Sequence, residues 1–540
     1  MAEVTPKPAP VREQREKKES LKKREAAGHV GRTPDTAKVP AAPSPMRYNI
    51  GPPKHSDFEP PRDPLFVSHE PIPFLTPDGQ TELKRPIDHA ENKRSYRYTH
   101  CVADPLFRHK QYYRQSDAKP FGPRMSFEDG DRWMHYDDSG TMVSIEKGWR
   151  MGRGNVVARE GRLYYEVKII NGVPAEGDAV PPGSQGQPQP HIRMGWARRE
   201  APLDAPVGFD GYSYGITDIR FDTMHKSRPG KIAPPKAKGK ALKSKASQPK
   251  TGQSPVDHVR TGDVIGMEIT LPSLSLHRKV VDGNYNPAVD FGDGFDPVPI
   301  VPGVAPDPAQ DIIRDRIPVP YKGNVYFEQQ DYIATKDMEL YADRSPQAST
   351  ALAALSMAAS KGSGSGTTAH APNPNHPQPA LRTLPNSSIK IYKNGQLVGT
   401  AFESLMSFLP PASAPNAAAG ARPGFDDGMV GYFPAVSAFS NGIAQVNFGP
   451  HWWCPPEELK DVEMSGTPKD GPEGRKLRGV GERYKEQIAE DVLWDLVDEA
   501  DFFAQDGGYE YQGEGRDVPG MEKGKGTVGT VARGMDGADY

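Results

Sequence analysis

The sequence predicts an all-β protein: an antiparallel β-sandwich with long disordered insertions, followed by one C-terminal amphipathic helix. Short segments rich in Val, Ile, Tyr and Phe alternate with clusters of Gly, Pro, Asp and Asn, which is typical of sandwich strands joined by turns. No amphipathic helix of about 10 to 15 residues separates consecutive segments, and this argues against an alternating α/β fold. With 55 Gly and 57 Pro among 540 residues, much of the chain is expected to be linker.

Residues 1–95 are expected to form a disordered arm that is basic and rich in proline. Their mixed-charge run VREQREKKESLKKREAA offers little apolar surface for a core. The sandwich is predicted over residues 96–455, where the strand-like segments follow one another. In chain order they are MVSIEKGW (142–149), LYYEVKII (163–170), IRMGWA (192–197), DVIGMEITL (263–271), NVYFEQ (324–329), SIKIYKNGQLVGTAF (388–402), YFPAVSAF (432–439) and AQVNFG (444–449).

The segment 388–402 predicts a β-hairpin. Ile389 and Ile391 alternate with polar residues up to the pair Asn394 and Gly395, after which apolar residues resume. Asn-Gly supplies the two positive-φ positions of a type I′ turn, the turn that suits the twist of a two-residue hairpin. We therefore expect two neighbouring antiparallel strands here.

Five stretches inside the sandwich are expected to be disordered insertions, because they are dominated by Pro, Gly, Ser, Ala, Asp or Lys. Lengthening a surface loop adds closure entropy only logarithmically, so a sandwich tolerates such insertions. Their approximate ranges are 173–190, 228–256, 282–320, 345–386 and 410–428.

The second insertion carries a lysine-rich run without acidic residues. One interpretation is a solvated loop; the other is a flexible arm that contacts nucleic-acid phosphates, such as nucleosomal DNA, or acts as a nuclear import signal. No aromatic residue is interleaved with the lysines, so stacking on single strands is not expected. The candidate phosphate-contacting residues are Lys236, Lys238, Lys240, Lys243 and Lys245.

After a predicted linker at 456–480, residues 481–505 predict one amphipathic helix, and residues 506–540 predict a disordered tail. Apolar residues recur in the helix at spacings of three and four. An isolated helix of this length is marginal in water, so its stripe is expected to bind a partner, with packing back onto the sandwich as the alternative. The stripe consists of Ile488, Ala489, Val492, Leu493, Leu496, Val497 and Ala500.

No pattern in the sequence indicates catalysis, a metal or a cofactor. The chain has two cysteines and lacks the HExxH and GxSxG patterns, and the triplet Asp290-Phe291-Gly292 stands outside any kinase context. No apolar run approaches the ~18 residues of a membrane span. We therefore expect a soluble intracellular protein that is not an enzyme, has no membrane contact and resides in a reducing compartment.

The order of the strand-like motifs resembles that of the SPRY domain: EGRLYYEVKI, IRMGWA, DAPVGFDGYSYG, GDVIGMEI, IKIYKNGQLVGTAF, YFPAVSAF and VNFGP. Three further features are similar to one SPRY family in particular: the strand NVYFEQQDY, the NFGP motif followed by Pro-Pro, and a C-terminal helix containing AEDVLWDLV. That family is the SPRY subunit of COMPASS, the trithorax-type histone H3 lysine-4 methyltransferase complex (Bre-two in yeasts, Ash-two-like in animals). Two cysteines do not suffice for the Cys-rich region of the animal members, so the chain resembles the shorter fungal form.

The resemblance implies a non-catalytic nuclear subunit of the complex. In the family a SPRY surface docks on the WD-repeat scaffold subunit through an acidic segment, the C-terminal helix binds a small dimeric helical docking subunit, and the SET-domain subunit carries the catalysis. The matching surface residues here are Trp149, Arg193, Pro206 and Phe209. Arginine beside aromatics and prolines suits an extended acidic peptide, because guanidinium binds carboxylates bidentately.

The chain departs from the family pattern after the SY pair, where basic residues are replaced by Gly215, Ile216, Thr217 and Asp218, with Arg220 as the nearest substitute. For Arg193 the alternative is an ordinary salt bridge, and Trp196 is expected in the core. The alternative function is that of a SPRY adaptor of a ubiquitin ligase or trafficking system.

Overall fold

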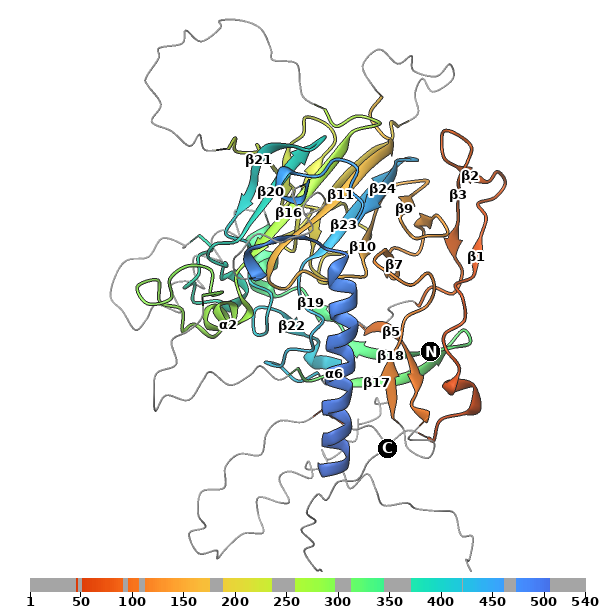
Figure 1. Ribbon diagram of the computed structural model, residues 1–540, viewed down its shortest axis with the longest axis vertical. Helices are drawn as coiled ribbons and strands as arrows, with labels where there is room; N and C mark the ends of the chain where they lie inside the picture. Colours follow the sequence, from red (N-terminus) through yellow and green to blue (C-terminus); the bar gives the residue numbers. More distant parts are fainter. Residues whose placement is uncertain are drawn as a thin grey trace, which may run out of the picture. The chain divides into compact units, whose positions relative to one another are not determined.

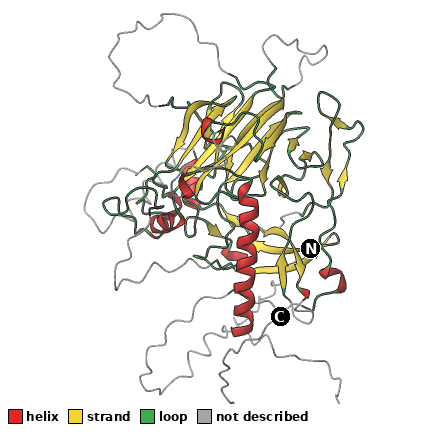
Figure 2. Ribbon diagram, in the orientation of Figure 1, coloured by secondary structure: helices red, strands yellow, loops and turns green. Residues whose placement is uncertain are grey.

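The computed structural model describes residues 45–46, 51–90, 96–105, 112–174, 188–235, 258–296, 312–343, 371–419, 421–460 and 473–505. Two large β-sheets form the body (Figure 1; Figure 2). The candidate lysines from Lys236 to Lys245, residues 1–44 of the predicted arm and the tail 506–540 lie outside the described residues.

The first sheet has seven antiparallel strands in the order β15-β14-β13-β12-β23-β10-β7. The strands are β7 (Met125–Gly130), β10 (Trp149–Gly154), β12 (His191–Ala197), β13 (Ser213–Thr217), β14 (Thr223–His225), β15 (Arg228–Gly230) and β23 (Phe433–Phe439).

The second sheet follows the order β21-β20-β16-β11-β24-β9-β8, and its eighth strand, β25, pairs with β11 in parallel. The strands are β8 (His135–Tyr136), β9 (Met142–Ser144), β11 (Gly161–Asn171), β16 (Val264–Leu271), β20 (Ser388–Lys393), β21 (Gln396–Glu403), β24 (Ile443–Asn447) and β25 (Leu477–Gly479). The predicted hairpin is confirmed as β20–β21, and its turn residues Asn394 and Gly395 have φ of 51° and 81°.

Apolar side chains of the two sheets share one core, and Trp196 of β12 lies at its centre. Trp196 is fully buried, and its ring meets that of Tyr165 from β11 edge-on at 5.0 Å. The neighbours Ile192 and Met194 are buried in the same cluster. The core position predicted for Trp196 and the all-β class are therefore confirmed.

A smaller four-stranded sheet has the order β17-β18-β5-β6. It consists of β5 (Tyr96–Ala103), β6 (Tyr113–Gln115), β17 (Arg316–Tyr321) and β18 (Asn324–Gln330). The remaining two-stranded pairs are β1 (Phe66–Val67) with β4 (Arg85–Pro86), β2 (Phe74–Leu75) with β3 (Glu82–Leu83), and β19 (Tyr332–Ile333) with β22 (Ala414–Pro415).

Helices are few in the described residues. The α-helices are α2 (Leu274–Asp282), α3 (Lys336–Ala342) and α6 (Glu482–Gln505), residues 457–460 are also α-helical, and the 3-10 helices are η1 (His55–Phe58), η3 (Pro379–Leu381), η4 (Ala417–Ala419) and η5 (Glu473–Arg475). Within this part of the chain no helix has the length and apolar character needed to cross a bilayer.

The predicted arm at 1–95 is wrong for residues 51–90. This segment carries η1 and β1 to β4, Leu83 is fully buried, and Phe66 meets Phe127 of the sandwich at 5.3 Å. Lys84 also forms a β-bridge with Tyr136 of β8. Strands of two residues are too short to show an alternating pattern, so the sequence does not reveal them. Their formation depends on partners elsewhere in the chain.

Several predicted boundaries inside and after the sandwich also need correction. The insertion 228–256 begins with β15, and the insertion 282–320 ends in β17. The ranges 345–386 and 410–428 contain the buried residues Leu384 and Ala412, and the linker 456–480 contains β25. Each segment is held by a sheet edge or a core neighbour that its own composition does not reveal.

Trp196→Ala is expected to lower the free energy of unfolding by about 3–5 kcal/mol, because it removes the largest side chain of the core. Chemical denaturation monitored by circular dichroism measures this change. Phe209→Ala is the matched control: Phe209 is 51% exposed, so its loss is expected to cost no more than about 0.5 kcal/mol. Equal effects of the two substitutions would contradict the core position of Trp196.

Candidate protein-docking sites

The first candidate site lies on the face of the seven-stranded sheet opposite the core. Successive side chains of a strand point to opposite faces, so the burial of Ile192 and Trp196 places His191 and Arg193 on the other face. The register aligns Trp149 of β10 with Phe439 of β23, and Phe439 with His191 of β12. Three rings from three adjacent strands therefore form one row.

The rings of this row are stacked. Trp149 lies 5.3 Å from Phe439 with an interplanar angle of 29°, and His191 lies 6.2 Å from Phe439 with an angle of 23°. The guanidinium carbon of Arg193 lies 4.8 Å from the centroid of the Trp149 ring. This cation–π contact presents the guanidinium beside a flat aromatic platform.

Arg193 has no hydrogen-bond acceptor and no ion-pair partner among the described residues. Burial lowers the pKa of Arg193, and the charge of Asp218 only partly opposes this effect. A carboxylate placed against this guanidinium would stabilise its charge. The alternative of an ordinary salt bridge for Arg193 is not what the described part of the chain shows.

The loop between β12 and β13 brings Pro206 and Phe209 to the same face. Ser437 of β23 is the register partner of Arg193, and the backbone N–H of Val207 donates to its hydroxyl at 3.1 Å. Pro206, next to Val207, is half-buried, and Phe209 is exposed. The structure therefore brings Trp149 and Arg193 into contact, and the bond from Val207 to Ser437 places the loop with Pro206 and Phe209 on the same face.

A tight turn holds this loop. The Phe209 N–H donates to the carbonyl of Pro206 at 3.0 Å, and Gly208 between them has a φ of 84°. A Cβ at position 208 would lie 2.4 Å from the carbonyl oxygen of Met224, which excludes other residues there. The turn that carries Phe209 therefore requires glycine at position 208, because the backbone of β14 lies against it.

The residues that depart from the family pattern supply no cation to this face. The Thr217 hydroxyl donates to the carbonyl of Ile219 at 2.7 Å, and the Asp218 carboxylate accepts the Ile192 N–H at 3.0 Å. Arg220 is exposed on the following turn with a φ of 62°. His191 and Phe439 are not among the residues that the sequence pattern predicted, because their position beside Trp149 depends on the register of β12, β23 and β10.

The second candidate site is α6. The predicted isolation of this helix is wrong, because its acidic face packs on the chain's own body. Asp495 accepts from Arg314 at 2.7 Å and from Arg316 at 3.0 Å, and Asp498 accepts from Arg314 at 3.3 Å. Both aspartates are buried. Removing one partner of a buried, hydrogen-bonded ion pair of this kind strongly destabilises the folded chain.

Further polar contacts hold the same face of α6 on the body. The Tyr484 hydroxyl donates to Asp117 at 2.7 Å, and the Gln487 side chain accepts the Val157 N–H at 3.1 Å and donates to the Asn155 carbonyl at 3.2 Å. The first two turns of α6 are thereby held beside the segment that joins β10 to β11.

The apolar stripe of α6 lies beside and opposite the face that packs on the body; it is exposed, and its edge residues Ile488 and Val492 also line a cavity between α6 and the body. Exposure ranges from 39% at Val497 to 56% at Leu493. A helix that buries carboxylates and exposes leucines reverses the usual amphipathic arrangement. The exposed stripe comprises all seven predicted residues, Ile488, Ala489, Val492, Leu493, Leu496, Val497 and Ala500.

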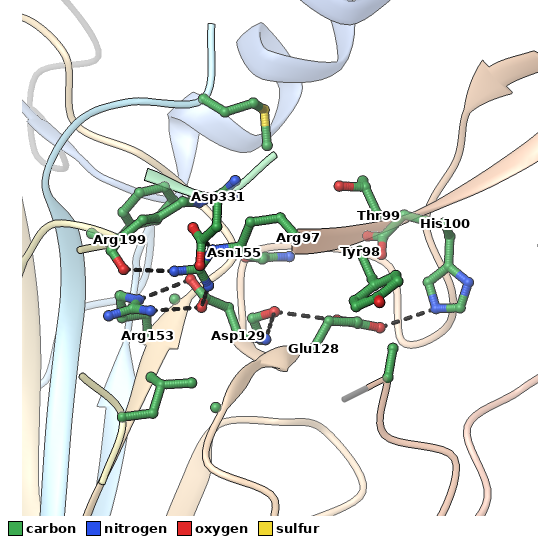
Figure 3. Close-up of a pocket in the computed structure, with 18 of the residues that line it drawn as sticks. Arg97, Tyr98, Thr99, His100, Glu128, Asp129, Arg153, Asn155, Arg199 and Asp331 are labelled. Atoms are coloured by element: carbon green, nitrogen blue, oxygen red, sulfur yellow. Dashed lines mark hydrogen bonds and ion pairs between the residues drawn. The ribbon is translucent and has the colours of Figure 1, made fainter. Parts of the chain in front are cut away.

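A cavity of about 890 Å³ lies where β5, β7, β10 and α6 meet (Figure 3). Its charged groups are largely paired with one another: Arg153 donates to Asp129 at 2.8 and 2.9 Å, and Arg97 also pairs with Asp129. Burial opposes the ionisation of Asp129, but the two arginines outweigh it and hold the pKa of Asp129 well below its usual range. The arrangement is a structural ion network.

Within the described ranges no group of three or more His, Cys, Asp or Glu side chains is placed to hold a metal ion.

Comparison with known proteins decides the family. A COMPASS component cclA from Colletotrichum higginsianum is 44% identical over 93% of this chain and 85% of the relative, and a COMPASS component cclA from Aspergillus fumigatus is 37% identical over 91% and 74%. The chain belongs to the cclA family of COMPASS components. A Set1 complex component ash2 from Schizosaccharomyces pombe is 32% identical over 85% of this chain and 52% of that protein.

No protein-family model matches the chain. Among solved structures, a human SPRY domain covers 58% of this chain and 94% of that domain at 11% identity, with a TM-score of 0.22, which is too low to carry an argument. The family assignment therefore rests on the cclA relatives, and it confirms the resemblance to an Ash2/Bre2-type COMPASS subunit.

In this family member, Asp491→Asn is expected to raise the melting temperature at pH 7.5 and to leave it nearly unchanged at pH 4. Burial raises the pKa of Asp491 to about 6 in the folded chain, against a usual 3.8. The folded state therefore binds the proton more tightly, and its stability falls as pH rises from about 4 to 6. Asparagine removes this loss and keeps an acceptor for Gln115, which donates at 2.7 Å.

Differential scanning fluorimetry across pH 4 to 8 measures the change. Lys485→Gln, at an exposed position of the same helix, is the control and is expected to leave the melting temperature nearly unchanged at each pH. A melting temperature of the Asp491 variant that stays below that of the unmodified chain at pH 7.5 would contradict the account.

Proposed function

We propose that this chain is a non-catalytic assembly subunit of a nuclear histone H3 lysine-4 methyltransferase complex. The observation that carries the proposal is the presence of two separate surfaces suited to protein partners, in a chain whose relatives are COMPASS components. One is the Arg193 face with Trp149, Pro206 and Phe209; the other is the exposed stripe of α6.

The Arg193 face suits an acidic segment of the WD-repeat scaffold subunit. Its guanidinium has no carboxylate partner among the described residues, and the adjoining rings offer a flat apolar surface for an extended backbone. Arginine and tryptophan are the side chains that most often dominate binding energy at protein interfaces. The arginine and the tryptophan on this face therefore favour peptide docking over catalysis.

The stripe of α6 suits the small dimeric helical docking subunit. Its residues at i, i+4 and i+8, such as Ile488, Val492 and Leu496, form the continuous apolar ridge that a helical bundle accepts. Because the ion pairs of Asp495 hold another face of α6 on the body, the apolar ridge has a fixed orientation. Fixed presentation lowers the entropy lost on binding.

With both partners bound, the chain would bring the scaffold and the dimeric subunit to the SET-domain catalytic subunit. Its own contribution to methylation is then positional, since no reacting group is assigned to it. Membership of a chromatin complex implies a nuclear location.

Arg193→Ala is expected to weaken association with the WD-repeat scaffold subunit by at least about tenfold, because a charged hydrogen bond worth about 1.5–3 kcal/mol is lost. Affinity purification of the tagged full chain from a fungal host, with co-eluting proteins quantified by mass spectrometry, measures this loss. The dimeric subunit is expected to co-elute unchanged. Co-elution of ubiquitin-ligase or trafficking proteins in place of methyltransferase subunits would contradict the proposed function.

Leu493→Asp combined with Leu496→Asp is expected to abolish pulldown of the dimeric subunit while leaving the melting temperature within about 2 °C, since both side chains are about half exposed. Lys485→Glu, an exposed position on the same helix, changes the net charge equally and serves as control. If the double variant still binds the dimer, α6 is not the docking helix.

A further inference from the structure

His191 occupies a distinctive position on the Arg193 face. It is two residues before Arg193 on β12, so the two side chains share a face at a spacing of roughly 6.6 Å. Its ring stacks on Phe439 at 6.2 Å, at the end of the row that Trp149 begins. Its side chain is 17% exposed, so it contacts solvent at the surface of the proposed docking face.

Asp218 determines which ring nitrogen of His191 carries the proton. One carboxylate oxygen of Asp218 accepts the Ile192 N–H and lies 3.0 Å from His191 Nδ1, and the other oxygen accepts the Ile219 N–H at 2.8 Å. A carboxylate in this arrangement acts only as an acceptor, so Nδ1 must be the donor. The neutral imidazole therefore presents the unprotonated Nε2, which is bonded to no group of the described chain.

The free Nε2 atom of a neutral His191 is a hydrogen-bond acceptor, so it cannot donate to a bound carboxylate. When His191 gains a proton, Nε2–H becomes a donor while Nδ1–H stays on Asp218. The same proton compensates the charge of Asp218, which otherwise opposes an acidic segment on this face. Histidine is the side chain that changes charge between about pH 5 and 8.

We propose that His191 is the second anion-binding group of the docking face, that it takes up one proton when an acidic segment binds, and that this segment carries carboxylates at alternate positions. The inference rests on the proposed function of the Arg193 face. An extended peptide places residues i and i+2 on one side about 6.6 Å apart, which matches the spacing of the His191 and Arg193 Cα atoms along β12. Neighbouring carboxylates i and i+1 point to opposite sides and do not match.

The charged groups around His191 are consistent with a single proton. Asp218 faces it from the turn after β13, Arg193 follows it on its own strand, and Arg220 lies on the turn that Asp218 begins. From β23 the contacting residue is Phe439, which does not titrate. Protonation thus adds one positive charge between one carboxylate and one guanidinium.

The experiment measures binding of two fluorescein-labelled pentapeptides to the full chain by fluorescence anisotropy at pH 6.0 and 8.0. The probes are Glu-Val-Glu-Val-Glu and its isomer Glu-Glu-Val-Val-Glu, which have equal charge and composition, and in the isomer no two glutamates are two residues apart. Glutamates are ionised at both pH values, so a pH effect on affinity comes from the protein. The alternating peptide is expected to bind several-fold more tightly than the isomer, and at least about fivefold more tightly at pH 6.0 than at pH 8.0.

His191→Gln keeps a side-chain donor for Asp218 and removes the titrating ring, so it is expected to bind equally at both pH values with the affinity of the unmodified chain at pH 8.0. Its melting temperature checks folding. Calorimetry of the unmodified chain in two buffers of different ionisation enthalpy at pH 7 is expected to show net proton uptake on binding.

The Arg193→Ala variant distinguishes a failure of the docking face from a failure of the role proposed for His191. If this variant loses binding at both pH values while His191→Gln keeps the pH dependence, or calorimetry shows no proton uptake, the docking face stands and the role of His191 is overturned. If Arg193→Ala binds the alternating peptide as well as the unmodified chain, the face itself is not the acid-binding surface and both proposals fail. Equal affinity for the two isomeric peptides overturns the alternate spacing.

Discussion

The in-register pairing of β12 with β23, and of β23 with β10, is the constraint on which the rest of the molecule depends. Because side chains alternate along a strand, the burial of Trp196 and Met194 in the core fixes the outward position of Arg193 and His191. A slip of one residue would place the arginine in the core and the tryptophan in solvent. The core packing that stabilises the sandwich therefore also fixes which side chains lie on the proposed docking face.

Helix α6 is held on the body by a different kind of contact. Its carboxylates, rather than its apolar side chains, hold it on the body, through Arg314 and Arg316 at the start of β17. This arrangement leaves the apolar ridge exposed, at a cost in solvation that a bound partner would remove. The chain thus combines one rigid face on a sheet with one ridge on a seated helix. Both suit assembly, and neither brings reacting groups together.

The sequence predicted the features that depend on local pattern. The alternating segments gave the strands of the sandwich, Asn394-Gly395 gave the hairpin, and the spacing of Ile488, Val492 and Leu496 gave the helix. What it missed depends on distant partners. The pairing of β5 with β18 joins residues more than 200 positions apart, and the short strands at 66–86 need the sandwich to exist. Likewise, Arg314 and Asp495 are charges that only the fold brings together.

We propose that the chain works by holding two partners at two separate surfaces. Hydrogen–deuterium exchange of the full chain, alone and with each of the two proposed partner subunits, tests it most directly. The account predicts slower amide exchange at 191–211 with the scaffold subunit only, and at 486–500 with the dimeric subunit only. Protection of both regions by one partner, or of neither region by any subunit of the complex, would contradict it.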